Sequence, residues 1–408
     1  MQSSKLIVDG KTGASNGWRR VKFGDVVRFV KEDADPDSGE FERYVAGEHI
    51  ETDNLHIRKW GTVGDGYLGP AFHRRFKKGQ VLYGSRRTYL RKIAVAEFDG
   101  ITANTTFVLE PSGDDLIPEL LPFVMQTETF TQHSIKQSKG SVNPYINFKD
   151  IAWFEFALPP KDEQRRIAEI LWSADEARRA LDQVVIAAEK HKRSLLDQEL
   201  SLGHGQRKPV PLHKVCEMQN GRSFSSALYH KTGPKLLRPG NLGIDGYLDW
   251  RPDATRCLPQ SILTEASRYV VNPGDVVINL TAQSLEDGFM GRVCLAKSER
   301  DRSLLNQRIG RFVCRDCVLP EFLFRCFQTR RFRGLVESSC EGSKIKHLYW
   351  RHFADFEIPL PPKDEQTQIA KLFQEVETAV GQAVRHTCET RELHVSLLHN
   401  LLTARKNV

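Results

Sequence analysis

A string of seven residues occurs twice in this chain. Leu158–Gln164 reads Leu-Pro-Pro-Lys-Asp-Glu-Gln, and Leu360–Gln366 repeats it 202 positions later. Over the wider window, 11 of the 17 residues of Phe154–Ile170 are identical to their counterparts in Phe356–Leu372. Self-similarity at a fixed offset indicates an internal duplication. The fold must therefore contain the same structural unit twice.

The duplication extends upstream of the repeated string, with insertions. Gly140-Ser141 aligns with Gly342-Ser343 at the same offset, whereas Gly79–Tyr83 aligns with Gly274–Ile278 at an offset of 195. These shifts predict two related globular domains that share a framework and differ in loop length. Loop variation on a common scaffold is a usual way for binding specificity to diverge.

Short segments rich in β-branched and aromatic residues, separated by Gly and Pro, predict strands in both globular domains. These segments are Gln80–Gly84, Lys92–Glu97, Asn104–Leu109 and Asp275–Leu280. Helical patterns cover Pro118–Phe130 and Pro320–Val336 near the end of each domain. Each domain is expected to be mixed α/β, with its topology left open.

Each copy of the repeated string opens a long helical pattern. The proline pair Pro159-Pro160 disfavours helix before it, and Asp162 and Glu163 suit the positive end of a helix dipole. Residues at a 4-3 spacing, which is typical of a coiled-coil seam, continue through the first helix until Gly203 and Gly205. The expected seam is Ile170, Ala174, Ala177, Leu181, Val184, Ala188, His191, Leu195, Gln198 and Leu202.

The second helix is expected from about Lys363 to Thr403. Its middle, around His386–Thr390, is polar. We expect His191 and His386 to lie on the seams as packing residues rather than ligands. One side of the second helix carries Ile369, Phe373, Val376, Val380, Ala383, Leu397 and Leu401.

The predicted fold class is α/β: two mixed α/β domains joined by two long antiparallel coiled-coil helices, with an internal pseudo-two-fold repeat. We expect domain 1 at 1–157, a central helix at 158–205, domain 2 at 206–357 and a C-terminal helix at 358–408. Two-fold DNA-binding proteins place their reading surfaces roughly 34–36 Å apart. If this chain does so, divergence of its halves predicts a split, non-palindromic site.

Composition adds weaker constraints. No run of 18 apolar residues exists and the first residues are polar, so we expect a cytoplasmic protein. A net charge of +7 favours a nucleic-acid partner over an acidic one. All eight cysteines follow residue 215, and Cys314-Arg315-Asp316-Cys317 has no second pair nearby. We interpret them as reduced thiols rather than a zinc site.

Domain 1 carries two basic clusters that could contact DNA. The first follows a predicted strand, and its arginines could pair with phosphate or guanine, although a solvated turn explains them equally well. Its candidates are Ser85, Arg86, Arg87, Tyr89, Arg91 and Lys92. The second surrounds Gly140 and contributes Lys136, Lys139, Ser141 and Asn143.

Domain 2 carries the corresponding candidates with less charge. The segment aligned with the first cluster is polar and contributes Thr281, Gln283 and Ser284. The segment around Gly342 contributes Ser343, Lys344 and Lys346, and lysines beside Gly-Ser in both copies favour a role in contacting the DNA backbone. Arg222 is a further candidate, with Ser223 and Arg238 near it in the same domain.

Three enzymatic motifs are incomplete. Gly10-Lys11-Thr12 resembles the end of a P-loop, but Lys5 stands where its opening glycine belongs. Asn143-Pro144-Tyr145 lacks the second proline of an amino-methyltransferase motif, and no glycine-rich turn for S-adenosylmethionine accompanies it. Pro36-Asp37 is not followed by the acidic-x-Lys of a nuclease. The sequence therefore supports no catalytic residue and no metal ligand set.

The chain resembles the specificity subunits of type I restriction–modification enzymes. The resemblance rests on a Leu-Pro-Pro-x-x-Glu-Gln-x-x-Ile string that opens a long helix after each recognition domain, here Leu158–Ile167 and Leu360–Ile369. The aromatic-containing strands before each string, the segment Leu82–Lys92 and the segment Leu237–Leu242 also fit. The resemblance covers nearly the whole chain.

This resemblance implies a non-catalytic DNA-recognition subunit. Each domain would read one half of a bipartite, asymmetric DNA site, and the paired helices would set the unread spacer. Two methyltransferase subunits and ATP-dependent restriction subunits would bind to it. The chain itself would hold no cofactor, whereas S-adenosylmethionine, ATP and Mg²⁺ would belong to those partners, and no membrane would be involved.

Three alternatives stay open. A methyltransferase in its own right would bind S-adenosylmethionine as an isolated chain. A coiled-coil scaffold without a nucleic-acid role would show no sequence-specific DNA binding even with its partners. A specificity subunit of a related fused or non-cleaving system would be distinguished by the neighbouring genes.

Overall fold

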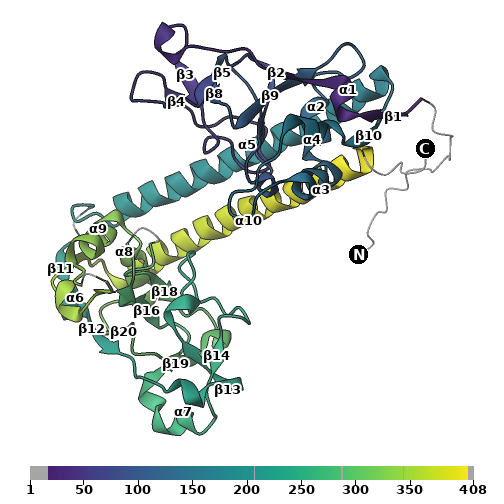
Figure 1. The fold of residues 1–408 in the computed structure, drawn as a ribbon. Helices are drawn as coiled ribbons and strands as arrows, with labels where there is room; N and C mark the ends of the chain where they lie inside the picture. Colours follow the sequence, from purple (N-terminus) through teal and green to yellow (C-terminus); the bar gives the residue numbers. More distant parts are fainter. Residues whose placement is uncertain (1–16, 206, 286–287, 343, 403–408) are drawn as a thin grey trace, which may run out of the picture. The chain divides into compact units, whose positions relative to one another are not determined.

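The computed structural model describes residues 17–402, apart from 206, 286–287 and 343. The chain forms two compact units. Unit 1 contains the described residues up to Leu181 together with those from His386, and unit 2 is Asp182–Arg385. Each unit therefore combines one globular domain with a part of each long helix (Figure 1).

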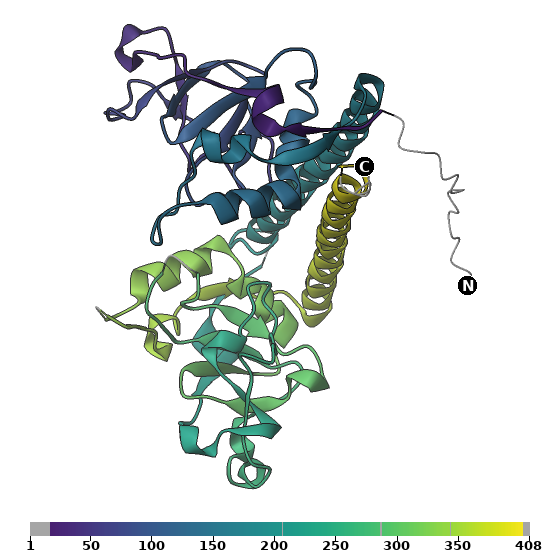
Figure 2. The ribbon, with the colours of Figure 1, turned by 45° about the vertical axis from the view of Figure 1, so that its right-hand side comes forward.

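Domain 1 contains two four-stranded sheets. The first has the order β2-β9-β6-β7 and the second β4-β3-β8-β5. A separate antiparallel pair, β1 (Arg19–Lys22) and β10 (Glu155–Leu158), joins the start and the end of the domain (Figure 2). The strands of the sheets are β2 (Val27–Val30), β3 (Arg43–Val45), β4 (Gly61–Thr62), β5 (Phe72–Phe76), β6 (Val81–Gly84), β7 (Ile93–Val95), β8 (Gly100–Ala103) and β9 (Thr106–Pro111).

Domain 2 repeats this arrangement. Its sheets have the orders β12-β20-β16-β18 and β14-β13-β19-β15, and β11 (Pro209–Pro211) pairs with β22 (Glu357–Pro359). A further short pair joins β17 (Thr281–Ala282) to β21 (Lys346–His347). The sheet strands are β12 (Cys216–Asn220), β13 (His230–Leu237), β14 (Arg256–Cys257), β15 (Val270–Val271), β16 (Val276–Asn279), β18 (Val293–Leu295), β19 (Ser303–Leu305) and β20 (Ile309–Cys314).

The two domains share their strand pairing as well as their strand order. In each domain one sheet contains a single parallel pair, β3 with β8 and β13 with β19, among antiparallel neighbours. A short helix precedes the first sheet in both, α1 (Phe23–Val26) and α6 (Leu212–Val215), and domain 2 also has α7 (Ile262–Glu265). The duplication seen in the sequence is therefore a duplication of the fold.

The helical pattern near the end of each domain is interrupted, contrary to the prediction of one helix. Domain 1 has α2 (Leu121–Gln126) and α3 (Glu128–Gln137), and domain 2 has α8 (Pro320–Phe327) and α9 (Arg330–Ser339). The residues that precede α3 and α9, Thr127 and Thr329, are extended, and each side chain accepts a hydrogen bond from the amide three residues later. Threonine at this N-cap position starts a new helix in both copies.

The repeated string forms a latch between each domain and its long helix. The helices are α5 (Lys161–Glu199) and α10 (Lys363–Leu402); α4 (Phe148–Ala152) precedes β10. In α5, Gln164 accepts from the amide of Ile117 at 2.9 Å and donates to the carbonyls of Asp115 and Pro159, both at 2.8 Å. Gln164 is buried, and these three hydrogen bonds give its amide oxygen and nitrogen the partners that a buried amide needs.

The second copy makes the same three bonds. Gln366 accepts from the amide of Leu319 at 2.8 Å and donates to the carbonyls of Cys317 and Pro361 at 3.0 and 2.8 Å. Both glutamines are almost completely buried. The glutamine of the repeated string therefore has a structural role in both halves.

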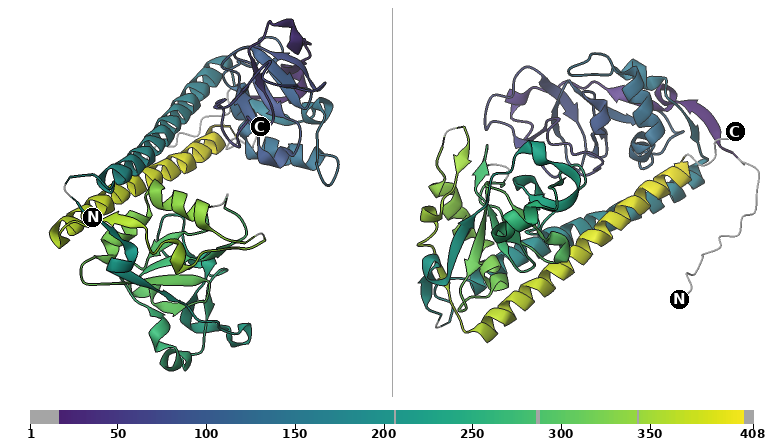
Figure 3. Two further views of the ribbon diagram at one scale, coloured as in Figure 1. Left: turned by 90° about the vertical axis from the view of Figure 1, so that its left-hand side faces the viewer. Right: turned by 90° about the horizontal axis from the view of Figure 1, so that it is seen from below.

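Within each unit the two helix segments run antiparallel. In unit 1, Leu171 of α5 and Leu398 of α10 belong to one hydrophobic core with domain 1. In unit 2, Leu196 of α5 shares a core with Ile369 and Phe373 of α10. Early residues of one helix thus lie beside late residues of the other in both units, as the coiled-coil prediction requires (Figure 3).

The seam of α5 is displaced by one residue from the prediction. Val184 is 53% exposed and His191 is exposed, whereas Leu171 and Leu196 are buried. The same 4-3 spacing holds, but charged side chains occupy several of its positions and conceal it from a search for apolar residues. The positions along this displaced seam are Leu171, Asp175, Arg178, Asp182, Val185, Glu189, Lys192 and Leu196. Within α5, five residues of the predicted seam are half-buried beside it: Ile170, Ala174, Leu181, Ala188 and Leu195.

The apolar side of α10 follows the prediction, and its later members Leu397 and Leu401 are half-buried against the core of unit 1. Ile369, Phe373 and Val380 are buried. Its later inward positions are Thr387, His394 and Leu398, whereas His386 is exposed. The polar middle of this helix therefore still has a buried side.

The structure bears on membrane-spanning segments and on the cysteines. Among the described residues, no helix is long and apolar enough to cross a membrane. The eight cysteines are free thiols.

Candidate nucleic-acid interface

In domain 1 the structure brings the two predicted basic clusters together. Arg86 and Tyr145 form an antiparallel bridge, and the amide of Arg87 donates to the carbonyl of Pro144 at 2.6 Å. Lys139 and Tyr145 exchange backbone hydrogen bonds of 2.8 and 2.9 Å. The segments 85–92 and 139–145 thus form one continuous surface at the end of β6.

The outer part of this surface is cationic and aromatic. The guanidinium of Arg86 lies 5.7 Å from the ring centre of Tyr145, close enough for a cation–π contact. Arg87 has a left-handed backbone, with φ of 48°, as has Arg91. The exposed candidates on this surface are Arg86, Arg87, Tyr89, Lys136, Lys139, Ser141 and Asn143.

Other predicted residues of domain 1 are engaged in the fold. Arg91 donates to Asp53 at 2.6 Å, to Glu128 at 2.8 Å and to the carbonyl of Gln126. These contacts tie the loop after β6 to α2 and α3. Arg91 therefore positions this loop, and its guanidinium is already neutralised.

Three further candidates have internal partners. Ser85 is buried and its hydroxyl donates to the carbonyl of Thr105 at 2.6 Å. The ammonium of Lys92 donates to the carbonyl of Gly47, and that of Lys139 pairs with Asp150 at 3.0 Å. Only the arginines at 86 and 87 combine exposure with a full positive charge in the first cluster.

Domain 2 assembles the corresponding segments in the same way. Thr281 faces His347 and Ala282 faces Lys346 in the pair β17–β21. Gln283 and Lys344 are exposed, Ser284 and Lys346 are half-buried, and Ser343 lies outside the described residues. The two predicted segments meet again, but this surface is polar rather than arginine-rich.

A buried ionic cluster joins domain 1 to α5. Asp175 is 2% exposed, and Nε2 of His56 lies 2.9 Å from its carboxylate. Nδ1 of His56 lies 2.7 Å from Glu97, and Arg178 contacts Asp175 at 2.6 Å. Because both imidazole nitrogens face carboxylates, the cluster favours the doubly protonated ring.

The pKa values reflect this geometry. The hydrogen bond to Asp175 raises the pKa of His56, against the lowering effect of burial. Burial would raise the pKa of Asp175, but hydrogen bonds from His56 and Arg178 lower it to about 2. Asp175 is therefore ionised near neutral pH, and its charge favours protonation of His56.

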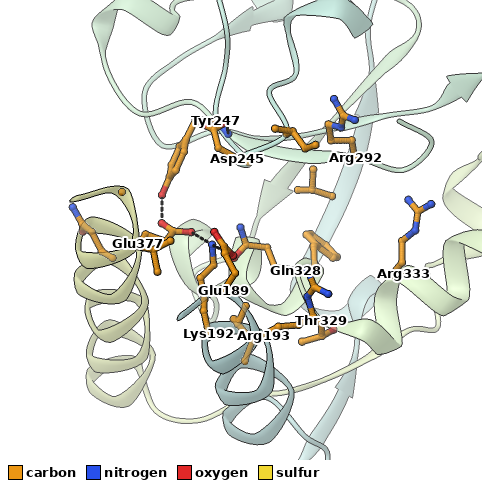
Figure 4. Close-up of a pocket in the computed structure, with 18 of the residues that line it drawn as sticks. Glu189, Lys192, Arg193, Asp245, Tyr247, Arg292, Gln328, Thr329, Arg333 and Glu377 are labelled. Atoms are coloured by element: carbon orange, nitrogen blue, oxygen red, sulfur yellow. Dashed lines mark hydrogen bonds and ion pairs between the residues drawn. The ribbon is translucent and has the colours of Figure 1, made fainter. Parts of the chain in front are cut away.

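Unit 2 has a carboxylate at the equivalent position, with different partners. Glu377 of α10 stands 202 residues after Asp175. Arg325, 4% exposed, donates to it at 3.0 Å, and the Tyr247 hydroxyl donates at 2.5 Å. Figure 4 shows the tyrosine pointing at the carboxylate, with Lys192 of α5 beside it, 3.9 Å away.

Each unit contains a pocket where its helix segments meet these clusters. The unit 2 pocket holds about 1150 Å³ and the unit 1 pocket about 620 Å³. Their linings correspond at the offset of 202: Gln328 and Thr329 match Gln126 and Thr127. Seven Lys or Arg and three acidic residues line the former, but three Arg, three acidic residues and two His the latter.

Sequence reasoning missed Asp175, Glu377 and their partners. Asp175 and Glu377 do share the offset of 202, which is the one signal that pointed to them. Charged residues on a long helix are usually solvated, so neither was distinguishable from a surface residue before its partners were known. Among the described residues, no group of three His, Cys, Asp or Glu side chains could hold a metal ion.

Comparisons with known proteins agree with the repeated architecture. The family model "Type I restriction modification DNA specificity domain" matches residues 16–186 and again residues 207–382. The "Type I restriction enzyme MjaVIII specificity subunit" of Methanocaldococcus jannaschii is 23% identical over 328 residues, covering 76% of this chain and 75% of its own length.

Two solved structures share the fold. One, titled for complex assembly and conformational transition of the type I R-M system, has a TM-score of 0.61 at 20% identity, covering 95% of this chain and 97% of that chain. The S subunit of a type I system from M. genitalium has a TM-score of 0.57 at 12% identity, with 96% and 98% covered.

Proposed function

Since the chain belongs to the specificity-subunit family of type I restriction–modification systems, we propose that it reads a bipartite, asymmetric DNA site and is not itself catalytic. The duplicated family domain carries this proposal, because two related but diverged domains suit two different half-sites. In this proposal the surfaces formed by 85–92 with 139–145 and by 281–284 with 344–347 face the two half-sites.

The charge of these surfaces supports different modes of contact. Arg86 and Arg87 are exposed and suit phosphate or guanine. Gln283 and Thr281 suit base edges or backbone oxygens without adding charge. The domains would then read their half-sites with different chemistry, as an asymmetric site requires.

We propose that the pockets at the helix segments receive the two methyltransferase subunits. A pocket that recurs at equivalent positions of both units suits two copies of one partner. Restriction subunits would join that complex. S-adenosylmethionine, ATP and Mg²⁺ would be bound by the partners, and the complex would act in the cytoplasm, where chromosomal DNA is accessible.

The decisive experiment is methylome sequencing of a methylation-free host that expresses this chain with its methyltransferase subunit. A bipartite N6-methyladenine motif that requires this chain is the expected result. A complex that forms without creating any motif would favour the scaffold alternative. S-adenosylmethionine binding by the isolated chain would favour the methyltransferase alternative.

The spacer role can be tested in the same assay. Inserting one heptad after Ala188 of α5 and a matching heptad after Gly381 of α10 preserves the antiparallel pairing of unit 2. Seven residues add about 10.5 Å of helix, so the unread spacer should lengthen by about three base pairs while both half-sites persist. An unchanged spacer would contradict the proposal that the paired helices set the spacer length.

A further inference from the structure

Domain 2 contains a second, smaller cavity away from the long helices. Its volume is about 510 Å³, and its lining comes from four segments of the chain, one of them at β14 (Arg256–Cys257). Tyr229 precedes β13, Arg238 follows β13, and the turn from Asn306 to Arg308 connects β19 to β20. The lining contains three arginines but no acidic residue, so the cavity is positively charged.

Aromatic rings hold two arginines at the edge of this cavity. The guanidinium of Arg238 lies 5.8 Å from the ring centre of Tyr229, and that of Arg222 lies 5.6 Å from the ring centre of Phe224. Phe224 and Tyr229 both line the cavity. Both distances are within cation–π range, and a guanidinium in such a contact can still donate its N–H groups to an anion.

The backbone of Arg222 lies against the turn that carries Arg308. Arg222 and Asn306 form a parallel bridge, and the amide of Gln307 donates to the carbonyl of Arg222 at 3.0 Å. This approach depends on Gly221, because a Cβ there would lie 2.1 Å from the carbonyl oxygen of Asn306. Arg308 extends from the same turn.

The arginines differ in their engagement. Arg256, the remaining cation of the lining, donates to the carbonyls of Asp253 and Thr255 at 2.9 Å. Arg222, Arg238 and Arg308 have no ion-pair partner within the part of the chain that the structure describes. Two of these unneutralised guanidinium groups, those of Arg238 and Arg308, thus belong to the cavity lining, and Arg222 adds a third at its edge beside Phe224.

Domain 1 lacks this arrangement at the equivalent positions. Asp33 corresponds to Arg222 after the first sheet strand, Ala46 corresponds to Arg238 after β3, and Thr106 corresponds to Arg308 at the offset of 202. The arginines of the neighbouring strand β5 are paired with acids, Arg74 with Asp33 and Arg75 with Glu40, each at 3.0 Å. The arginine pocket is therefore specific to domain 2.

We propose that this pocket binds DNA backbone phosphate beside the half-site of domain 2, so that domain 2 supplies the larger share of salt-dependent affinity. The proposal rests on the proposed function for its DNA partner. Phosphate fits better than a base edge, because one bidentate arginine already satisfies the two acceptors of guanine, whereas several phosphates can use three arginines.

The test measures binding of the full chain to a random-sequence duplex of about 30 base pairs by fluorescence anisotropy over a range of salt concentrations. The triple variant Arg222→Ala/Arg238→Ala/Arg308→Ala should lower the slope of log K against log salt by about three. Its affinity at about 0.1 M salt should fall roughly a hundredfold. Replacing the three by lysine should retain most of the slope, because lysine also binds phosphate as a point charge.

Two matched variants remove an arginine that is already neutralised. Arg251→Ala lies in the same domain, where Asp249 pairs with it at 2.7 Å, and Arg74→Ala lies in domain 1. Neither should change the slope. Thermal unfolding of the triple variant should stay close to wild type, since Arg222 and Arg308 are exposed and Arg238 is half-buried.

An unchanged slope in a folded triple variant would overturn the proposal. Loss of methylation specificity at one base pair, with an unchanged salt slope, would also overturn it, because the pocket would then contact a base rather than phosphates. Because the duplex has random sequence, the slope is informative even if no bipartite methylation motif exists. Failure of the phosphate pocket is thus separable from failure of the proposed function.

Discussion

Asp175 and Glu377 occupy equivalent positions in the duplicated fold, yet they are neutralised from different places. Asp175 is paired by Arg178 of its own helix and by His56 of a domain 1 loop. Glu377 is paired by Arg325 of α8 and hydrogen-bonded by Tyr247. The fold thus retained an inward-facing carboxylate on the long helix, 2% exposed at Asp175 and 13% at Glu377, while its partners diverged.

This difference has a physical reason. A buried carboxylate needs a cation and hydrogen-bond donors, but it does not matter which segment provides them. Gln164 and Gln366 behave differently, because their partners are backbone groups that the shared fold places identically. Backbone partners keep a contact the same in both copies, whereas side-chain partners can be exchanged.

The largest effect is expected from Arg325→Ala. It removes the buried cation of Glu377 and leaves the carboxylate, whose side chain is 13% exposed, with the more distant Lys192 ammonium at 3.9 Å, which should destabilise unit 2 by about 3 kcal/mol. Chemical denaturation would measure the loss, and hydrogen exchange would assign it to unit 2. Arg315→Ala removes an exposed pair with Glu217 and should cost less than about 1 kcal/mol. Equal losses for the two variants would contradict a buried anchor.

A smaller and symmetric effect is expected from Gln164→Ala and Gln366→Ala. Each change removes three hydrogen bonds and leaves buried backbone groups unpaired, at a cost of about 2–3 kcal/mol. Hydrogen exchange should report each loss in its own unit. Clearly unequal costs would show that the two latches are not equivalent.

The smallest effect is a pH dependence confined to the buried ionic cluster of unit 1, around Asp175 and His56. The raised pKa of His56 means that its stabilisation is complete below about pH 6.5 and is lost as the pH rises through the folded-state pKa. Burial lowers the pKa of His394, so its contribution is lost as the pH falls below about 6.5. Stability there should therefore peak near pH 6.5.

Charged neighbours of His56 are Glu97, Asp175 and Arg179, and only the carboxylates favour its protonation. Hydrogen exchange of α5 around Asp175, corrected for intrinsic rates between about pH 5.5 and 8, would measure the peak. His56→Gln should abolish the alkaline decline and leave the acidic one. The segment around Glu377 should stay level in this range, because the effect of Arg325 on the pKa of Glu377 acts at lower pH. A matching peak there would contradict the comparison.

The candidate interface was partly predictable. Gly140 and Gly342 with their lysines, and the segments aligned with Arg86, are visible in the sequence, and the structure joins them in pairs. The engagement of Arg91 was not predictable, because Asp53 and Glu128 lie 38 and 37 residues away along the chain. A cluster of arginines in sequence does not reveal which of them already have partners.

The sequence by itself determined the duplication, the starts of both long helices after the proline pairs and the mixed α/β class, because these depend on local patterns and on self-similarity. Only the tertiary structure decided which face of α5 is buried. Asp175 lies inward because His56 and Arg178 pair with it, and Lys192 lies inward beside Glu377 of α10. A search for apolar periodicity cannot find a seam that contains charged residues, because the partners that allow these residues to be buried come from distant segments of the chain.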